Sequence, residues 1–557
     1  MDFSIKLSHK QIEINTKLDQ IIVGDLVYLY KGLSKELATD LISAQKCQDI
    51  NLFLNKIELP YFLFFVIDKK LNTISAYNDH FGSNEVYYVK NEDGWFLSNK
   101  IETLLPTLAE SSIRQQSVYE MIVFQGVLPP ETMFENVFCI PSGTALHFDC
   151  KTYTSESYWD VTSLLGNKVT DYDAQVISSD RVLKNQVKFL DKKTTAIALS
   201  GGVDSGGLLG MMREIHGYGV KTISIGGRGS DTHDLTSARN SAAFNKAEPK
   251  ELYPEFADIQ KMWRYTHGLS QPVSASTLFV YSLINDWAKE VGVSNVVYGF
   301  GAEMLLGNLR VAKIADKLRY ESVIPKIILK PIYYLGVKIL GFKKTHLEFL
   351  QSFSWLDRFM YVRGAHFTWE RDYFTDDSIS LWEKVSKKIS AEDQTDLEVT
   401  DRLVLLYLKS WVNYLQARDI TAFGQLTGVM PVIPFDSTEV ARVFMQTSVR
   451  DRKRNNWNKQ LIRDVMKPYV QDSLFKNPVR SLIVPYNDLF LGKTDILISY
   501  MKGSRIIGNS FDFSKIATDY DQLPEGGLFL MHILGVVVWY DSNYDTQRKS
   551  EFDALFN

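Results

Sequence analysis

The chain has 557 residues, of which 45% are hydrophobic and 23% charged, values typical of a folded globular protein and not of a disordered or fibrous one. A single hydrophobic core does not grow to this size, so we expect at least two domains. The 62 Lys and Arg residues nearly balance the 66 Asp and Glu residues, for a net charge of −4, which argues against dedicated nucleic-acid binding.

Short runs of alternating hydrophobic and polar residues dominate the chain up to about residue 160. This period of two, with turn-forming residues at 80–84 and 91–94, predicts antiparallel strands. The strands are expected at 61–70, 72–79, 85–98 and 143–149. A helix is expected at 112–127 and a polar linker at 158–173. We therefore expect an α+β domain over residues 1–165.

Strands alternate with helices after about residue 176. The expected β runs lie at 194–200, 221–226 and 294–301. Of the helices between them, one begins at Asp234 and another covers 277–291. Such alternation predicts a parallel sheet with ligands at the carboxyl ends of its strands. The rest of the chain is expected to be mostly helical, so the second domain would cover residues 176–557.

Two apolar stretches bear on membrane association. Residues 323–341 contain Lys326, Lys330 and Lys338, and each lysine at the centre of a spanning helix costs about 2.5–3.5 kcal/mol, so we expect a packed amphipathic hairpin there. Residues 527–540 are too short to span, which predicts a buried helix. No secretory signal is visible and the three cysteines have no paired spacing, so a cytoplasmic protein without disulfides is expected.

A glycine-rich turn follows the first β run of the second domain, with the sequence Ser-Gly-Gly-Val-Asp-Ser at 200–205. Two glycines let the backbone turn tightly, so that amide N–H groups and a helix N-terminus can face an anion. The hydroxyls of Ser200 and Ser205 add donors, and Asp204 can hold a cation. The turn predicts a site for pyrophosphate and Mg²⁺, although no Gly-Lys-Ser/Thr follows as in a Walker loop.

In full, this motif resembles the pyrophosphate loop of the N-type ATP pyrophosphatases, which cleave ATP between its α and β phosphates and adenylate a substrate oxygen. The flanking segments are similar to those of the asparagine-synthetase-like superfamily, which includes asparagine synthetase, the β-lactam and carbapenam synthetases and the lasso-peptide macrolactam synthetases. The resemblance implies an adenine-nucleotide α-hydrolase-like synthetase domain that uses ATP and Mg²⁺. The residues expected to contact the nucleotide are Leu199, Ser200, Gly201, Gly202, Val203, Asp204, Ser205, Ile225, Gly299 and Gly301.

The first domain resembles the class II glutaminase domain, an Ntn-type α+β sandwich. Residues 78–88 look like the Arg-Asp-x-x-Gly…Leu-Tyr-Tyr run of that domain, and 126–134 is similar to a later segment. Glutaminases of this class need a cysteine as the first residue of the mature chain, where its α-amino group activates its own thiol. Residues 1–3 are Met-Asp-Phe, and the nearest cysteine is Cys47. The resemblance therefore implies a glutaminase-like domain that is inactive.

Two segments of the second domain extend the resemblance. Residues 223–226 resemble the strand whose backbone reads adenine. Residues 299–304, Gly-Phe-Gly-Ala-Glu-Met, differ from the Gly-Glu-Gly-(Ser/Ala)-Asp-Glu of asparagine synthetase and share with β-lactam synthetase an aromatic residue between the glycines. Glu303 stands in the place of a Mg²⁺-binding aspartate, so the resemblance implies Asp204 and Glu303 as metal ligands.

Two catalytic residues also follow from the resemblance. Residues 411–418 resemble the helix that carries a catalytic tyrosine, here Tyr414, whose partner acid is replaced by Met430. Residues 457–463 resemble the start of the Lys-x-x-Leu-Arg helix. Lys459 is therefore expected to stabilise the charge that develops on the tetrahedral intermediate and the α-phosphate.

Without ammonia from glutamine, the second domain is expected to use another amine. We expect it to adenylate a carboxylate and close an intramolecular amide as a lasso-type macrolactam synthetase, because loss of the acid at Met430 departs from the small-molecule enzymes. This implies a leader-cleaved core peptide as substrate, with a leader-binding protein and a cysteine protease as partners. A β-lactam-type synthetase with a small amino-acid-like substrate, an ammonia-dependent asparagine-synthetase-like amidotransferase and a non-catalytic scaffold remain alternatives.

Overall fold

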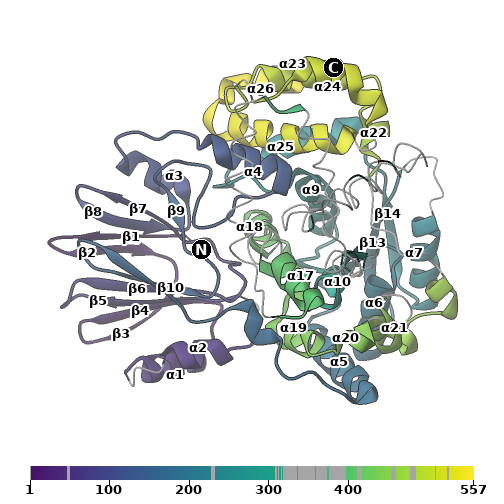
Figure 1. Ribbon diagram of the computed structural model, residues 1–557, viewed down its shortest axis with the longest axis horizontal. Coiled ribbons are helices and arrows are strands. Elements are labelled where there is room, and N and C mark those ends of the chain that lie inside the picture. The colour runs from purple at the N-terminus through teal and green to yellow at the C-terminus, as the bar shows by residue number, and fades with distance from the viewer. Residues whose placement is uncertain are drawn as a thin grey trace.

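The computed structural model describes residues 2–46, 50–59, 61–227, 233–307, 397–409, 417–452, 454, 459–476, 484–508, 510–523 and 526–556, with single positions between 310 and 375. These residues form two units, a β-sandwich flanked by helices and an α/β unit with a parallel sheet (Figure 1). The α/β fold class expected from the sequence is confirmed.

Two antiparallel sheets form the first unit. One has the order β2 (Ile12–Thr16), β1 (Phe3–Ser8), β8 (Gly94–Ser98), β7 (Tyr87–Asn91) and β9 (Phe138–Cys139). The other has the order β11 (Tyr153–Ser157), β10 (Thr144–Phe148), β6 (Thr73–Asn78), β5 (Leu63–Asp68), β4 (Leu26–Lys31) and β3 (Asp19–Val23).

The central strands of the sandwich are buried on both faces. In β5, Leu63, Phe65 and Ile67 belong to the core between the two sheets. The alternate residues, Phe64 and Val66, belong to the core shared with the helices. This alternation explains why the run is almost wholly apolar, and it gives a helix–sheet–sheet–helix stack (Figure 1). The helices of this unit are α1 (Lys35–Lys46), α2 (Ile50–Lys56), α3 (Ile101–Leu104) and α4 (Gln115–Phe124).

The segment expected as a linker begins packed on the first unit. Trp159 is buried, and its ring stacks on that of His80 with centroids 4.8 Å apart. Asp160 then caps the 3₁₀-helix η2 (Val161–Leu164) by accepting a hydrogen bond from the amide of Thr162 at 2.8 Å. The connection to the second unit is therefore fixed by apolar contacts up to about residue 165.

A parallel sheet forms the centre of the second unit. Its order is β14 (Glu248–Leu252), β13 (Lys221–Ile225), β12 (Thr195–Ala198), β15 (Asn295–Tyr298) and β16 (Met430–Val432). The three strands expected from the sequence are its middle strands. The two edge strands escape prediction because each contains a proline, which the ladder tolerates only at an edge or bulge.

Helices cover the parallel sheet and continue past it to the C-terminus (Figure 1). Before the sheet ends they are α5 (Tyr172–Val187), α6 (Val203–His216), α7 (His233–Phe244), α8 (Lys261–Thr266), α9 (Ala275–Glu290), α10 (Ala302–Leu306), α17 (Val399–Tyr407) and α18 (Ala417–Thr427). After β16 they are α19 (Thr438–Met445), α20 (Val449–Arg452), α21 (Gln460–Met466), α22 (Tyr486–Leu489), α23 (Thr494–Lys502), α24 (Phe513–Asp519), α25 (Gly526–Tyr544) and α26 (Lys549–Ala554).

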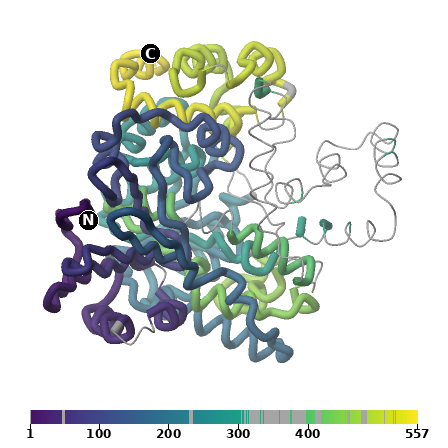
Figure 2. The backbone as a smooth tube through the Cα atoms, turned by 60° about the vertical axis from the view of Figure 1, so that its left-hand side comes forward, coloured from purple at the N-terminus to yellow at the C-terminus, as the bar shows by residue number. Residues whose placement is uncertain are grey.

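Helix α25 contains the apolar stretch near the C-terminus and is buried, as expected. The indole N–H of Trp539 donates a hydrogen bond to the Leu269 carbonyl at 2.8 Å. A Cβ at Gly535 would lie 2.3 Å from the Cβ of Ala275, so this glycine lets α25 pack closely on α9. The helix also contacts α4 of the first unit, and both views show the C-terminal helices against that unit (Figures 1 and 2). Within the described ranges, no helix is both long and apolar enough to cross a membrane.

A buried polar network joins the two units. Arg418 on α18 donates to the carboxylate of Asp419 at 2.9 Å and to the Val127 carbonyl at 3.4 Å, and its Nε lies 3.8 Å from Glu85. Asp419 in turn accepts a hydrogen bond from the amide of Ser274 at 3.1 Å. The Arg418 and Asp419 side chains are only 7% and 4% exposed, so the charges are paired away from solvent.

We expect Phe65→Ala to destabilise the first unit, because Phe65 is fully buried and its ring packs edge-to-face on Phe3 with centroids 5.2 Å apart. Truncating a buried phenylalanine costs about 3–5 kcal/mol. Scanning calorimetry should show a melting temperature lowered by about 10 °C. Phe189→Ala is the matched control, since Phe189 is 85% exposed. Equal melting temperatures for the two variants would contradict the placement of Phe65.

Candidate functional site

The glycine-rich turn lies at the carboxyl end of β12, the middle strand of the parallel sheet. The amide of Leu199 continues the strand pairing by donating to the Ile223 carbonyl at 2.8 Å. The amide of Ser200 then donates to the hydroxyl of Ser205 at 3.2 Å, which closes the turn. Gly202 is the N-cap of α6, so the first amides of this helix point into the turn. The turn and the helix N-terminus form one anion-binding concavity.

Gly201 has a backbone conformation that the turn requires. Its φ is +77°, and a Cβ there would lie 2.2 Å from the carbonyl oxygen of Asp234 at the start of α7. At Gly202, by contrast, φ is −86° and a Cβ would meet only the Ser200 hydroxyl, at 3.4 Å. Gly201 therefore permits both the left-handed turn and the contact with α7.

Glycines on α6 bring a distant helix to the turn. A Cβ at Gly207 would lie 2.1 Å from the sulfur of Met466, and one at Gly210 would lie 2.3 Å from the Tyr469 carbonyl oxygen. Met466 ends α21, and Tyr469 ends the 3₁₀-helix η8 (Lys467–Tyr469). Because these positions carry no side chain, α21 packs directly on α6. The N-cap of α21 is Lys459, which thereby reaches the phosphate turn.

Lys459 forms an ion pair with Asp204, in which Nζ lies 2.9 Å from Oδ2. The two side chains are 15% and 19% exposed, so the pair is accessible from one side. Lys459 has φ +51° and ψ +44°, a left-handed conformation that costs a non-glycine residue about 1–3 kcal/mol. Such strain is typical of residues held in place for function. The structure thus places a cation and a carboxylate together at the N-terminus of α6.

Arg463 adds a second cation near Asp204. Burial lowers the pKa of the Arg463 guanidinium, and the charge of Asp204 opposes this shift. One guanidinium N–H donates to the carbonyl of Phe475 at 2.8 Å, which holds the side chain. Arg463 follows Lys459 by four residues and so lies on the same side of α21.

Two glycines follow β15 and line the neighbouring part of the sheet edge. A Cβ at Gly299 would lie 2.7 Å from the amide nitrogen of Ser205, so the Gly299 backbone abuts the phosphate turn. Gly301 has φ +113°, and a Cβ there would lie 2.6 Å from the Cβ of Phe435. On the other side of β12, Ile225 ends β13 and is buried. The edge is thus formed by consecutive strand ends, in the order β13, β12, β15.

The predicted residues that the structure brings together at this edge are Leu199, Ser200, Gly201, Gly202, Val203, Asp204, Ser205, Ile225, Gly299, Gly301 and Lys459. Tyr414 lies outside the described residues, as does the side chain of Glu303, whose backbone belongs to α10. Two charged residues at this edge were not expected as site residues, although Arg463 stands at the arginine of the Lys-x-x-Leu-Arg resemblance. The four-residue spacing from Lys459 could have indicated Arg463. The position of Asp436 shortly after the last β strand could have indicated that residue.

A second hollow lies beside the start of β1, where the two units meet. It is small and is lined by Phe3, Leu18, Lys31, Leu63, Ser83, Asn84, Glu85, Asn99, Ala422 and Gln425. Lys31 donates a hydrogen bond to the amide oxygen of Asn84 at 2.9 Å, and burial lowers the pKa of this lysine. None of the described lining residues is a cysteine, and Cys150 lies by Ser8 at the opposite end of β1.

Groups of three or more His, Cys, Asp or Glu side chains suited to a metal ion do not occur in the part of the chain that the structure describes. Asp204 is a carboxylate in the first turn of α6, beside the phosphate turn.

The asparagine synthase family matches residues 180–494, and the glutamine amidotransferase domain family matches residues 54–159. The chain is 22% identical to the glutamine-hydrolyzing asparagine synthetase 1 of Bacillus subtilis over 292 residues, which cover 49% of this chain and 44% of the relative. It is 20% identical over 341 residues to a Methanocaldococcus jannaschii protein named as asparagine synthetase 2, with 58% of this chain and 65% of the relative covered. The matches span less than two thirds of either relative.

Two solved structures are similar to parts of the chain. An NH3-dependent NAD synthetase from Campylobacter jejuni is 19% identical, with 25% of this chain and 61% of that chain covered. A glutamine phosphoribosylpyrophosphate amidotransferase from B. subtilis is 8% identical, with 54% and 84% covered. Both have a TM-score of 0.19, which is too low to support an argument about this chain.

We expect Gly201→Ala to disturb the turn, because a Cβ there meets the Asp234 carbonyl and the residue must keep a positive φ. The expected cost is about 1–3 kcal/mol. Hydrogen exchange should show faster exchange of the amides of Ser200 and Gly206, whose hydrogen bonds hold the turn. Gly202→Ala is the matched control, since nothing closer than 3.4 Å opposes its Cβ. The assigned turn geometry would be wrong if Gly201→Ala exchanged as slowly as Gly202→Ala.

Proposed function

Because the chain belongs to the asparagine synthase family, we propose that it is an ATP-dependent ligase that adenylates a carboxylate and joins it to an amine. The observation that carries this proposal is the ion pair between Lys459 and Asp204 at the phosphate turn. It joins a cation, a carboxylate and an array of amide donors, which together suit the phosphates of ATP. The alternative of a non-catalytic scaffold gives no reason for a strained lysine at this place.

The order of the strands suits the order of groups in an acyl-adenylate. We propose that adenine contacts the end of β13 near Ile225, as the family resemblance implies. The phosphates would then occupy the turn after β12, and the acyl group would lie beyond Gly299 toward β15. Adjacent strands are about 4.8 Å apart, so three strand ends span roughly the length of the activated substrate.

Adenylation would make the carboxylate reactive. A carboxylate oxygen attacks the α-phosphorus of ATP, the bond to the bridging oxygen breaks, and pyrophosphate leaves with the electron pair. Backbone amides of the turn and the N-terminus of α6 hold the phosphates. Asp204 is placed to hold Mg²⁺, which when bound neutralises phosphate charge. Lys459 would stabilise the negative charge that builds on the α-phosphate and on the later tetrahedral intermediate, an effect worth several kcal/mol in a dry site.

The finer proposal is that the amine belongs to the substrate, so that the product is an intramolecular amide, the macrolactam ring of a lasso-type peptide. It is supported by the hollow beside β1, where the described lining residues include Lys31 and no cysteine that could hydrolyse glutamine. Met430, which replaces the acid of the small-molecule synthetases, also favours it. The substrate would be a leader-cleaved core peptide, and a leader-binding protein and a cysteine protease would be partners.

An asparagine-synthetase-like reaction with free ammonia is the second candidate. The names of the two curated relatives favour it, since both are called asparagine synthetases. A β-lactam-type synthetase shares the aromatic residue between Gly299 and Gly301. All three candidates release pyrophosphate from ATP and differ in the source of the amine.

Pyrophosphate release with Mg-ATP tests the function. The arms are a peptide with a free N-terminal amine and an internal Asp or Glu, L-aspartate with ammonium, and L-aspartate with L-glutamine. We expect release with the peptide, accompanied by the loss of one water from its mass. Release with ammonium alone would favour the second candidate, and release with glutamine would show that the first unit is an active glutaminase.

In the same assay we expect Lys459→Ala to lower the rate by about 10²–10³-fold, because a fixed cation at developing charge is lost. Lys467→Ala is the matched control, since Lys467 follows α21 and is exposed. Equal rates for the two variants would contradict the role of Lys459. Stabilisation of the native protein by ATP, measured as a shift in melting temperature, checks that the nucleotide binds.

A further inference from the structure

Asp436 lies at the same edge of the parallel sheet as the phosphate turn. It ends η6 (Pro434–Asp436), four residues after β16. β16 pairs with β15, and β15 pairs with β12, so β16 lies two strands from the phosphate turn. At a strand spacing of about 4.8 Å, the end of β16 is about 10 Å from the end of β12. Asp436 is therefore placed beyond the phosphates, toward the acyl end of the proposed adenylate.

The backbone of Gly301 separates Asp436 from the rest of the edge. A Cβ at Gly301 would lie 3.4 Å from Oδ1 of Asp436 and 2.6 Å from the Cβ of Phe435. Any other residue at position 301 would press on the η6 turn. The second glycine of the Gly-Phe-Gly motif thus lets the segment after β15 pack directly against Phe435 and the carboxylate of Asp436.

The Asp436 carboxylate lacks the partners that a structural carboxylate would have. Its Oδ2 is shielded from solvent and accepts no hydrogen bond from the residues that the structure describes, while the side chain as a whole is half-buried. Burial raises the pKa of Asp436 to about 7. The next two hydroxyls, those of Ser437 and Thr438, are also buried without a partner in the described chain. A buried polar group without a partner is uncommon and is often functional.

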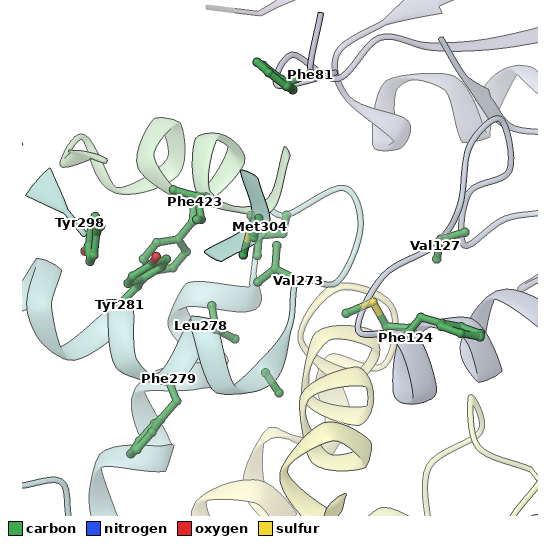
Figure 3. Close-up of a cluster of buried hydrophobic side chains, with 14 of the residues drawn as sticks. Phe81, Phe124, Val127, Val273, Leu278, Phe279, Tyr281, Tyr298, Met304 and Phe423 are labelled. Atoms are coloured by element: carbon green, nitrogen blue, oxygen red, sulfur yellow. The ribbon is translucent and has the colours of Figure 1, made fainter. Parts of the chain in front are cut away.

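The neighbours of Asp436 are aromatic. The ring of Tyr281 on α9 is tilted against that of Tyr298 of β15 at a centroid distance of 4.7 Å, and it stacks on Phe423 of α18 at 6.3 Å (Figure 3). Burial and then the charges of Tyr298 and Asp436 raise the pKa of Tyr281. Burial is the one cause of the raised pKa of Asp436, so no cation among the described residues neutralises its carboxylate.

We propose that Asp436 is the general base of the amide-forming step, in the place of the acid lost at Met430. This inference rests on the proposed function and assigns the proton acceptor of the same site. The amine nitrogen attacks the acyl carbon of the adenylate, and a C–N bond forms as the carbonyl electron pair moves to oxygen. The proton on nitrogen passes to the Asp436 carboxylate. The C–O bond to phosphate then breaks, and AMP leaves with the electron pair.

The choice of nucleophile separates this role from adenylation. Hydroxylamine is largely uncharged at neutral pH and attacks acyl-adenylates with little need of a base, so it reports adenylate formation as a hydroxamate. An amine that must lose a proton depends on the base, which typically contributes 10²–10⁴-fold. The experiment uses the substrate with which the native protein releases pyrophosphate. Hydroxamate is measured with hydroxylamine present, and amide is measured without it.

We expect Asp436→Asn to form the hydroxamate within about 3-fold of the native rate and to form the amide at least 100-fold more slowly. Asp436→Glu keeps the carboxylate and should retain more of the amide-forming rate. Glu439→Gln is the matched control, because it removes one carboxylate charge from the first turn of α19. The carboxylate of Glu439 accepts hydrogen bonds from Asn185 and Gln186 on α5.

Equal loss of hydroxamate and amide in Asp436→Asn would overturn the inference, because Asp436 would then act in adenylation or folding. If Asp436→Asn formed the amide at the rate of the native protein, the inference would also be overturned. If the native protein releases no pyrophosphate with any substrate of the assay, the proposed function fails, and the inference fails with it. Hydroxamate formation by the native protein keeps the two outcomes distinct.

Discussion

The close approach of α21 to α6 is the constraint on which the proposed active site depends. Gly207 and Gly210 leave no room for a side chain between these segments, since a Cβ at either would lie within 2.3 Å of Met466 or Tyr469. This contact joins residues about 255 positions apart in the chain. Lys459 begins α21, so a wider separation of the two helices would move its ammonium away from Asp204. The strained backbone of Lys459 is stable only because the helix behind it is held so closely.

Parallel pairing imposes the second constraint. Because all five strands of the sheet run in one direction, the segments that leave them emerge on one edge. The phosphate turn follows β12, the two glycines follow β15, and Asp436 follows β16. In the proposed reaction, adenine, phosphate, acyl group and amine lie along these strand ends in succession. The glycines at 299 and 301 keep neighbouring segments in contact, since side chains there would clash with Ser205 and Phe435.

Most of the fold and the phosphate site could be predicted from the sequence, for local reasons. The middle strands of the parallel sheet are short apolar runs, and the turn at Gly201 carries its signal in consecutive residues. The edge strands β14 and β16 could not be predicted, because polar residues and proline interrupt them and only pairing with a neighbour makes them strands. The sequence predicted that Lys459 and Asp204 belong to the same site, but it did not predict their ion pair. That contact depends on Gly207 and Gly210, which let α21 pack on α6. Asp436 was not predicted, because it is marked by the burial of Oδ2 and by the lack of a hydrogen-bond donor to this atom among the described residues. A sequence motif contains neither property.

The proposal that the first unit supplies no ammonia raises the question of what that unit contributes. The interface suggests that it supports the second unit physically. Arg418 of α18 is buried against Glu85 and the Val127 carbonyl, and α25 packs on α4. Removing the first unit would take away the Glu85 and Val127 partners of Arg418 and open its pair with Asp419 to solvent. It would also expose the apolar side of α25. Helix α18 also carries Phe423, whose ring stacks on that of Tyr281 on α9, and the charge of Asp436 acts on Tyr281. The interface with the first unit therefore holds in place a helix that packs beside the proposed amine site.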